Sequence, residues 1–237
     1  MTRRKDATLS VPSDHCIRMP QSGHPIVARL YDPVMTVAEQ SMLPPHREFL
    51  AEGLSGRVLD LGAGTGAMFP YFAGTDVELH AVEPDPHMRA QARDRAAELD
   101  LDVEVRDESG ESLPYEDDSF DAVVASFAFC TIPDQEAALS EVARVLRPGG
   151  EFRFLEHVRG EGATGRLHDL LAPGWHAVAG GCHLNRETGA LFRSDERFRL
   201  LEYEQLSDGA MPMIRGRLER KRDGSAVRRA LGRVPLL

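Results

Sequence analysis

A glycine-rich stretch and two acidic residues are the part of this sequence whose residue types and spacing point most directly to chemistry. Asp60 is followed by Gly62, Gly64 and Gly66, and Glu83 ends the next apolar stretch. Glycines let a ligand approach the backbone closely, and the start of a following helix adds unpaired N–H donors. Asp60 suits a cationic or hydrogen-bond-donating ligand, and Glu83 is placed to accept two ribose hydroxyl groups. The pattern therefore predicts a site for a small polar molecule.

The spacing of the glycines does not by itself identify that molecule. Gly62, Gly64 and Ala67 also satisfy the dinucleotide-binding fingerprint, and a glycine turn that binds no ligand is a further alternative. Because an acidic side chain at a strand end does not suit a pyrophosphate group, Asp60 favours a ligand that carries a positive charge.

The elements that must position these residues alternate between strands and helices. The apolar run 57–61 predicts a strand that enters the glycine turn, and 67–73 predicts a helix that leaves it. The other predicted helices cover 46–52, 87–99 and 134–147, and the other predicted strands cover 77–82, 101–105, 119–126, 151–157, 198–206 and 213–220. Such alternation produces parallel strands joined by crossovers. We therefore expect an α/β fold with a doubly wound, Rossmann-like, seven-stranded and mostly parallel sheet that has helices on both faces.

Several motifs in this order resemble a known family. The acid and glycines at 60–66, followed by Glu83, resemble the first two motifs of class I S-adenosylmethionine-dependent methyltransferases. The block from Leu113-Pro-Tyr115 to Arg147-Pro-Gly-Gly150 resembles the small-molecule branch of that family, the type 11 domain, and dinucleotide dehydrogenases lack this block. The resemblance covers about residues 55–157. It implies that the cofactor is S-adenosylmethionine and that the product is S-adenosylhomocysteine.

The resemblance also implies the cofactor-binding residues. In the family the loop before Leu113 places one side chain near the adenine amine, and Glu111 matches that position. The acid that usually precedes it by two residues is replaced here by Ser109, which makes Asp107 an alternative. Tyr31, in a Tyr-Asp-Pro context, is either a cofactor contact or a packing residue of an N-terminal lid. The expected cofactor-binding residues are Tyr31, Asp60, Gly62, Ala63, Gly64, Gly66, Glu83, Pro84, Ser109, Gly110, Glu111, Ser126 and Phe127.

The C-terminal third resembles a narrower group, the methyltransferase-like enzymes that methylate alkyl thiols. The stretches 154–158, 171–176 and 181–188 carry this resemblance. We expect methyl transfer to a small apolar acceptor, with a thiol as the first choice. A thiol with a pKa near 8.5 is only a few per cent ionised at neutral pH, so a base would help. His157 is the expected base, and a structural strand-end histidine is its alternative.

Other assignments remain open at this stage. A quinone or phospholipid methyltransferase shares the core motifs but not the tail, and a non-catalytic S-adenosylmethionine-binding module is suggested by the departure at Ser109. His176 and His183 are second candidates for the base. With His168 they lack the carboxylate or cysteine spacing of a metal site, so no metal is expected. We expect Cys130 and Cys182 to be packing residues.

The charge distribution bears on partners. The net charge is −10, while residues 213–237 hold eight basic and two acidic residues, so the rest of the chain carries −16. Because an acidic body repels phosphate groups, nucleic acid is not an expected partner. Lys5 and Lys221 are the lysines among 28 basic residues, which indicates either adaptation to high salt or a GC-rich genome. The basic tail could bind an acidic membrane surface, dock on the acidic body, or remain solvated.

The length and hydropathy of the chain suggest its organisation. A chain of 237 residues can bury one sizeable core, and no apolar run approaches the roughly 18 residues of a membrane span. The polar N-terminus does not resemble a signal peptide, so a cytoplasmic location without an integral membrane segment is expected. The expected divisions are a mobile segment (1–25), a helical lid (26–54), the methyltransferase domain (55–220) with a substrate cap near 160–190, and a basic tail (221–237).

Overall fold

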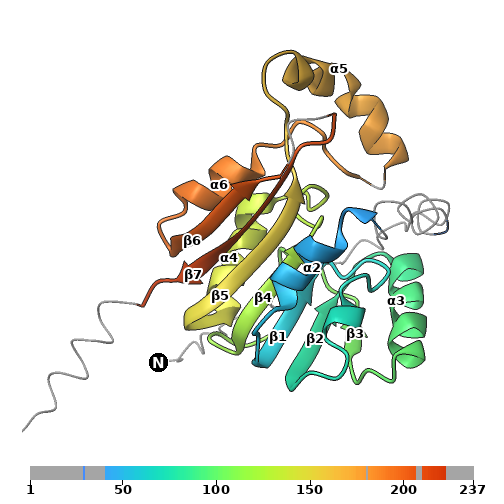
Figure 1. Ribbon diagram of the computed structural model, residues 1–237, viewed down its shortest axis with the longest axis vertical. Helices are drawn as coiled ribbons and strands as arrows, with labels where there is room; N and C mark the ends of the chain where they lie inside the picture. Colours follow the sequence, from blue (N-terminus) through green and yellow to red (C-terminus); the bar gives the residue numbers. More distant parts are fainter. Residues whose placement is uncertain (1–28, 30–40, 180, 207–209, 223–237) are drawn as a thin grey trace, which may run out of the picture.

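A seven-stranded sheet forms the centre of the protein, and helices cover both of its faces (Figure 1). The computed structural model describes residues 29, 41–179, 181–206 and 210–222. The strands are β1 (Gly56–Leu61), β2 (Val77–Val82), β3 (Glu104–Arg106), β4 (Phe120–Ser126), β5 (Leu146–His157), β6 (Phe198–Gln205) and β7 (Met213–Arg220). The helices are α2 (Pro44–Ala51), the 3₁₀ helix η1 (Phe69–Tyr71), α3 (Pro86–Glu98), α4 (Gln135–Val145), α5 (Gly162–Val178) and α6 (Thr188–Ser194).

The strand order is β3-β2-β1-β4-β5-β7-β6, and the strands from β3 to β5 in this order are parallel. Strand β7 runs antiparallel to both of its neighbours, β5 and β6. This confirms the predicted doubly wound, mostly parallel sheet. The order reverses at β1, which lies between β2 and β4. In open sheets of this kind ligands bind beyond the carboxyl ends of the strands at such a reversal.

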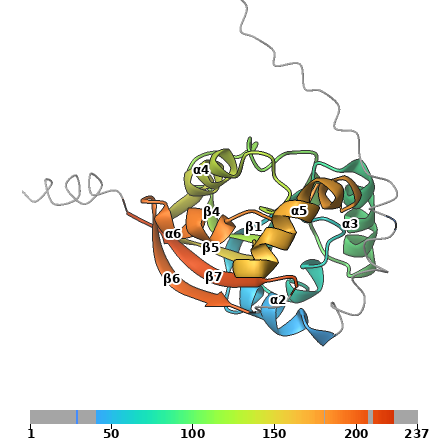
Figure 2. The same ribbon diagram turned by 90° about the horizontal axis from the view of Figure 1, so that it is seen from above.

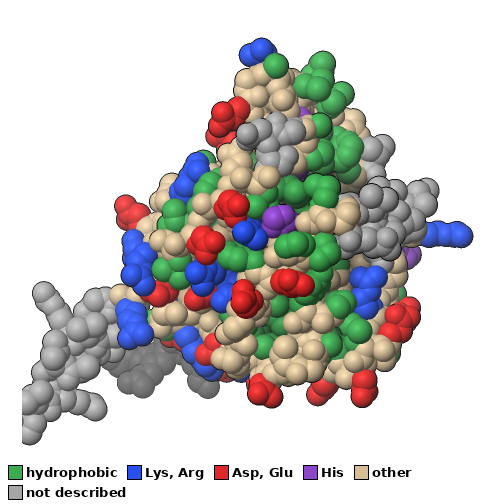
Figure 3. Space-filling model, in the orientation of Figure 1, with side chains coloured by type: hydrophobic (Ala, Val, Ile, Leu, Met, Phe, Trp, Pro, Cys, Tyr) green, Lys and Arg blue, Asp and Glu red, His purple; other side chains and the backbone are tan. Residues whose placement is uncertain are grey.

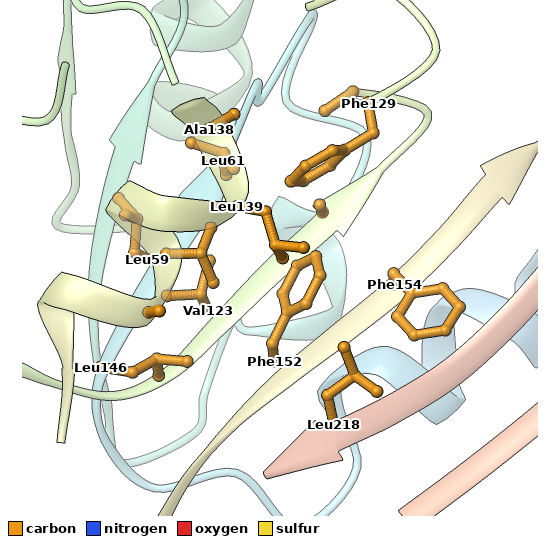
Figure 4. Close-up of a cluster of buried hydrophobic side chains, with 14 of the residues drawn as sticks. Leu59, Leu61, Val123, Phe129, Ala138, Leu139, Leu146, Phe152, Phe154 and Leu218 are labelled. Carbon is orange, nitrogen blue, oxygen red and sulfur yellow. The ribbon is translucent and has the colours of Figure 1, made fainter. Parts of the chain in front are cut away.

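Two hydrophobic clusters, one on each face, hold the helices to the sheet. On one face the apolar stripe of α4, with Ala138, Leu139 and Val142, packs on the alternate strand residues Leu59 and Val123 (Figure 4). Phenylalanines of β5 and α6 extend this cluster, and their rings are 4.6 to 5.3 Å apart. The opposite face is covered by α2, η1 and α3. Strand positions two apart therefore belong to the same cluster, as the pleat of a strand requires.

Helix α2 is packed into this second cluster. Leu43 and Leu50 are buried beside Phe69 of η1. The guanidinium of Arg153, on β5, donates hydrogen bonds to the carbonyl oxygens of Phe49 (3.1 Å) and Glu52 (2.6 Å). The helix expected at 46–52 is thus present and docked on the sheet. Residues 1–25, expected to be mobile, and almost all of the expected lid before α2 lie outside the described residues, as does the part of the expected tail beyond residue 222.

The segment after the glycine turn differs from the prediction. A helix over 67–73 was expected, and that expectation is wrong, because the chain forms successive tight turns with only the short helix η1. The N–H groups of Gly66, Phe69 and Phe72 each bond to the carbonyl three residues earlier. Pro70 has no N–H to continue an α-helical pattern. The turns also bring Gly66 so close to Phe69 that a Cβ atom there would lie 2.8 Å from the ring.

The boundaries of two other elements also differ from the expectation. Strand β3 begins at Glu104, later than the predicted 101. Strand β5 begins at Leu146, so the Arg147-Pro-Gly-Gly150 sequence expected to separate helix from strand lies inside the strand. The register of β4 and β5 shifts between Phe120 and Ala122, which accommodates these residues.

Helix α5 projects beyond the carboxyl ends of the parallel strands (Figures 1 and 2). Leu167, Leu170 and Leu171 on this helix are exposed, and hydrophobic side chains gather at that end of the molecule in the space-filling view (Figure 3). Across the described ranges, none of the helices combines the length and apolarity needed to cross a bilayer.

Candidate active site

A cavity of about 340 Å³ lies at the carboxyl ends of β1, β2 and β4. The structure brings most of the predicted cofactor-binding residues to its lining: Asp60, Gly62, Ala63, Gly64, Glu83, Pro84, Ser109, Gly110, Glu111, Ser126 and Phe127. Gly66 and His157 do not line it, and Tyr31 lies outside the described residues. The opposite side of the cavity is formed by residues 131–133 and by His176, Ala179 and Gly181.

The glycine turn needs glycine at each position for a different reason. Gly62 has a φ of +71°, and a Cβ there would lie 2.8 Å from the Cβ of Ala128. Gly64 has a φ of +58°, but a Cβ would meet no atom within 4 Å, because this residue faces the open cavity. Gly66, with a φ of +80°, packs against Phe69 and Ala92 instead. The first two glycines thus shape the cavity. The third allows close packing of the hydrophobic core next to it.

Glu83, at the end of β2, is held in a fixed orientation by the backbone. Its Oε2 accepts a hydrogen bond from the N–H of Gly64 (2.9 Å), and its Oε1 accepts one from the N–H of Asp85 (2.8 Å). Burial raises the pKa of Glu83 to about 7, although these two bonds oppose the shift. The carboxyl group therefore presents its remaining acceptor positions to the cavity.

Asp60, at the end of β1, is buried, and its Oδ2 finds no hydrogen-bond partner among the described residues. Burial raises the pKa of Asp60 to about 7, while the nearby charge of Arg47 lowers it. A buried acceptor with no partner is costly in an isolated protein. At the wall of a cavity it is suited to a ligand that donates hydrogen bonds.

Arg47 is the main lining residue that the sequence analysis missed. It lies on α2, is buried, and its Nη1 donates to the hydroxyl oxygen of Ser126 at the end of β4 (3.0 Å). The contact joins residues 79 positions apart, so no local pattern in the sequence indicates it.

The loop between β3 and β4 closes another side of the cavity. Ser109 donates a hydrogen bond to the carboxylate of Glu111, which also accepts the N–H of Asp134 (3.0 Å), the residue that caps α4. Gly110 is packed against Ile132 and Leu61. Asp107, the alternative partner for adenine, is paired with Arg89 (3.0 Å) and does not line the cavity.

The loop after β4 is organised by Glu156, a fully buried residue of β5. Its carboxylate accepts the N–H groups of Ala128 (3.0 Å), Phe129 (3.0 Å) and Cys130 (3.2 Å). Burial raises the pKa of Glu156 to about 8. Phe127, which lines the cavity, has a φ of +58° and so occupies a conformation that side chains rarely adopt. Such strain persists where surrounding contacts enforce it, commonly at functional sites.

The histidines occupy different environments. His157 is 3% exposed and lies beside Cys182, behind the cavity wall. His168 accepts the N–H of Gly160 and donates to the carbonyl of Ala210, so both of its ring nitrogens are used structurally. His176 lines the cavity, and its Nδ1 lies 3.0 Å from the carbonyl oxygen of Gly181. The centre of the His183 ring lies 4.3 Å from that of His176, and the two rings are tilted by 38°. The part of the chain described by the structure contains no group of three or more His, Cys, Asp or Glu residues arranged for a metal.

Comparison with known proteins identifies the family of the chain. A methyltransferase domain family matches residues 59–154. Thiol S-methyltransferase TMT1A of Homo sapiens is 31% identical over 166 residues, which are 67% of this chain and 67% of the human protein. Phosphatidylethanolamine N-methyltransferase of Cereibacter sphaeroides is 32% identical over 164 residues, 66% of this chain and 76% of that protein. The chain therefore belongs to the S-adenosylmethionine-dependent methyltransferases.

A solved structure shows the same fold. Geranyl diphosphate C-methyltransferase from Streptomyces coelicolor A3(2), in complex with Mg²⁺, geranyl diphosphate and S-adenosyl-L-homocysteine, superposes with a TM-score of 0.65 over 81% of this chain and 84% of that chain, at 16% identity. At this identity the likeness concerns the fold alone. The predicted enzyme class and its cofactor, S-adenosylmethionine, are confirmed by the family match and the relatives.

Proposed function

We propose that the protein binds S-adenosylmethionine on the glycine-turn side of the cavity and methylates a small, uncharged thiol on the opposite side. The buried, unpartnered oxygen of Asp60 would accept from the ammonium group of the cofactor. Each oxygen of Glu83 is bonded to one backbone N–H and keeps capacity for a ribose hydroxyl. Ser109, Gly110 and Glu111 would lie on the adenine side. When bound, the cofactor supplies a methyl group on a positively charged sulfur.

The charged residues that line the cavity support a neutral acceptor. Five carboxyl groups line the cavity, those of Asp60, Glu83, Asp85, Glu108 and Glu111. Among the described lining residues Arg47 is the single Lys or Arg, and it is bonded to Ser126. An acidic lining attracts a cationic methyl donor and repels an acceptor that bears a phosphate group. This favours a small neutral acceptor over a phospholipid headgroup.

His176 is our proposed base for the acceptor thiol. A carbonyl oxygen can only accept, so the contact with Gly181 places the proton of the neutral ring on Nδ1 and leaves Nε2 basic. A base in this position can hold the thiol proton while the sulfur attacks in line. His157, the base expected from the sequence, is buried behind the wall, which is why we assign this role to His176.

The names of relatives provide independent support. Human TMT1A carries the name thiol S-methyltransferase, and so does TMT1B of Rattus norvegicus, which is 34% identical over 146 residues. The Cereibacter sphaeroides relative is named for phosphatidylethanolamine, which makes that lipid the competing acceptor.

The experiment compares matched acceptors with purified protein and S-adenosylmethionine, with the methylated product and S-adenosylhomocysteine measured by mass spectrometry. The acceptors are a short alkyl thiol, the alcohol of the same carbon skeleton, the same thiol bearing a phosphate group, and phosphatidylethanolamine vesicles. We expect turnover of the neutral thiol, and little of the other three. Turnover of the lipid without turnover of the thiol would show that the acceptor assignment is wrong.

A further inference from the structure

We infer that Cys130 and Cys182 form a redox-active pair that hydroperoxides convert to an intramolecular disulfide. The two residues lie side by side, because the carbonyl oxygen of Cys130 accepts the N–H of His183, the residue after Cys182 (2.9 Å), and both cysteines are free thiols in the structure. Cys130 is buried, whereas Cys182 is partly exposed. The methyl-transfer mechanism above uses neither thiol.

The backbone around the two cysteines holds them together. The carbonyl oxygen of Cys130 accepts the N–H of His183 (2.9 Å), and the thiol of Cys130 donates to the carbonyl of Phe127 (3.3 Å). Arg186 donates to the carbonyl oxygen of Phe129 (2.6 Å), and Glu156 fixes the N–H of Cys130. The loop after β4 and the segment after α5 are therefore joined on both sides of the sulfur pair, which favours a bond between the sulfurs over reaction with a second molecule.

The surroundings make the two thiols chemically unequal. The neighbouring side chains of Cys130, His157 and Trp175 hold the pKa of the Cys182 thiol well below its usual range, against the opposing effect of burial. The neighbouring Cys182 thiol and burial raise the pKa of Cys130. Since the thiolate is the nucleophile in sulfur chemistry, Cys182 attacks first and Cys130 is the resolving thiol.

The chemistry balances with hydrogen peroxide as the oxidant. The Cys182 thiolate attacks one peroxide oxygen, the O–O bond breaks, and the leaving oxygen takes up protons as water, which gives a sulfenic acid on Cys182. The sulfur of Cys130 then attacks the sulfur of Cys182 and the hydroxyl group leaves as a second water. In total the two thiols lose two hydrogen atoms, that is, two electrons and two protons, to one peroxide, which becomes two waters. A dithiol reductant reverses the reaction.

The bond would fasten one wall of the cavity. Phe127, Ala128 and Thr131 line it from the loop that contains Cys130, and Ala179 and Gly181 line it from the segment that contains Cys182. In the oxidised protein these two stretches could not separate.

The test uses the full-length chain with Cys16→Ser, which removes the third thiol. After reduction and exposure to about one equivalent of peroxide, we expect an intact mass lower by two hydrogen atoms and a peptide map that links Cys130 to Cys182. Dithiothreitol should restore the mass, and the oxidised protein should melt at a temperature higher by about 5 °C or more. Sulfinic acid on Cys182 without the link, or links only between molecules, would overturn the inference.

Two variants separate the roles of the cysteines. In Cys130→Ala the reaction should stop at a sulfenic acid that dimedone traps on Cys182, whereas Cys182→Ser should react with neither peroxide nor dimedone. Equal dimedone labelling of the two variants would also overturn the assignment of the attacking thiol. These readouts do not depend on which acceptor the enzyme methylates, so the inference can fail or hold separately from the proposed function.

Discussion

The two sides of the cavity are built in different ways. The glycine-turn side consists of Asp60, Gly62, Gly64 and Glu83, which directly follow or end the buried strands β1 and β2. The opposite side includes His176 and the segment after α5, a helix whose Leu170 is 77% exposed. One side is thus fixed by the sheet, and the other by contacts between loops.

This difference suggests a division of labour. The side that would hold the methyl donor has buried carboxyl groups and backbone conformations that few substitutions can satisfy. The side that would hold the acceptor has half-exposed side chains and main-chain contacts. Binding of the donor should therefore be far more sensitive to substitution than recognition of the acceptor, and the following experiments test that contrast.

Gly64→Leu should produce the largest effect. Its side chain would enter the cavity, and overpacking against the ligand costs about 3 kcal/mol, roughly 150-fold in the affinity for S-adenosylhomocysteine. The backbone strain of the positive φ is present in the free protein as well, so it lowers stability and not affinity. Calorimetry measures the loss. Gly53→Leu is the matched control, since Gly53 has a φ of +68° and open space around it but does not line the cavity. Equal loss of binding in both variants would mean that strain, and not the cavity, is responsible.

Leucine-to-alanine substitutions on α2 and α5 compare how much each helix contributes to the free energy of unfolding. Leu50 of α2 is fully buried, so Leu50→Ala should lower the free energy of unfolding by about 3 kcal/mol. Leu170→Ala on α5 should change it by less than about 0.5 kcal/mol, because that side chain is mostly in solvent. Denaturant titration measures both. A loss of similar size at Leu170 would show that α5 is covered in solution.

His176→Gln should reduce kcat for the thiol by about a hundredfold, the usual contribution of a general base. Binding of S-adenosylhomocysteine should remain within a few-fold of the wild type, because the donor side is unchanged. His183→Gln is the control, since that ring contacts His176 without lining the cavity. A larger loss in His157→Gln than in His176→Gln would return the role of base to the buried histidine.

The pH dependence of donor binding should be smaller, about tenfold between pH 6 and 8. The pKa of Asp60 is raised to about 7, so the group gains its charge in this interval, and the charged form is the better acceptor for an ammonium group. The affinity for S-adenosylhomocysteine should therefore rise with pH. An affinity that is flat or falls across the interval would argue against contact between Asp60 and the ammonium group.

Stability without ligand should change in the opposite direction. A carboxyl whose pKa is raised on folding binds protons that the unfolded chain has released, so the stability it supports is present below the unfolded value of about 4 and is lost as the pH rises through about 7. Glu83 and Glu156 have the same sign of shift. Asp60→Asn should weaken this pH dependence in thermal melts while reducing donor binding.

The sequence predicted the sheet and the glycine-turn side because their determinants are local. Strand periodicity, the glycines at 62 and 64, and the strand-end acids each leave a signal within a few residues. The turns after Gly66 were misjudged because apolar composition outweighed Pro70. Arg47 was missed, and the burial of His157 away from the cavity was not foreseen, because their positions depend on contacts between distant segments, such as Arg47 with Ser126 and His157 with Cys182. No pattern of neighbouring residues encodes such contacts.

Arg186 links the two stretches of the acceptor side through main-chain atoms. Its guanidinium donates hydrogen bonds to the carbonyl oxygens of Phe129 and Ile132. The N–H of His183 donates to the carbonyl oxygen of Cys130. Since any residue type supplies a carbonyl oxygen, these hydrogen bonds do not depend on which side chains stand between 129 and 133. The cavity-lining side chains of Thr131 and Pro133 can therefore change over evolutionary time while the backbone stays in place, so a lineage with this architecture could exchange one substrate for another without rebuilding its core.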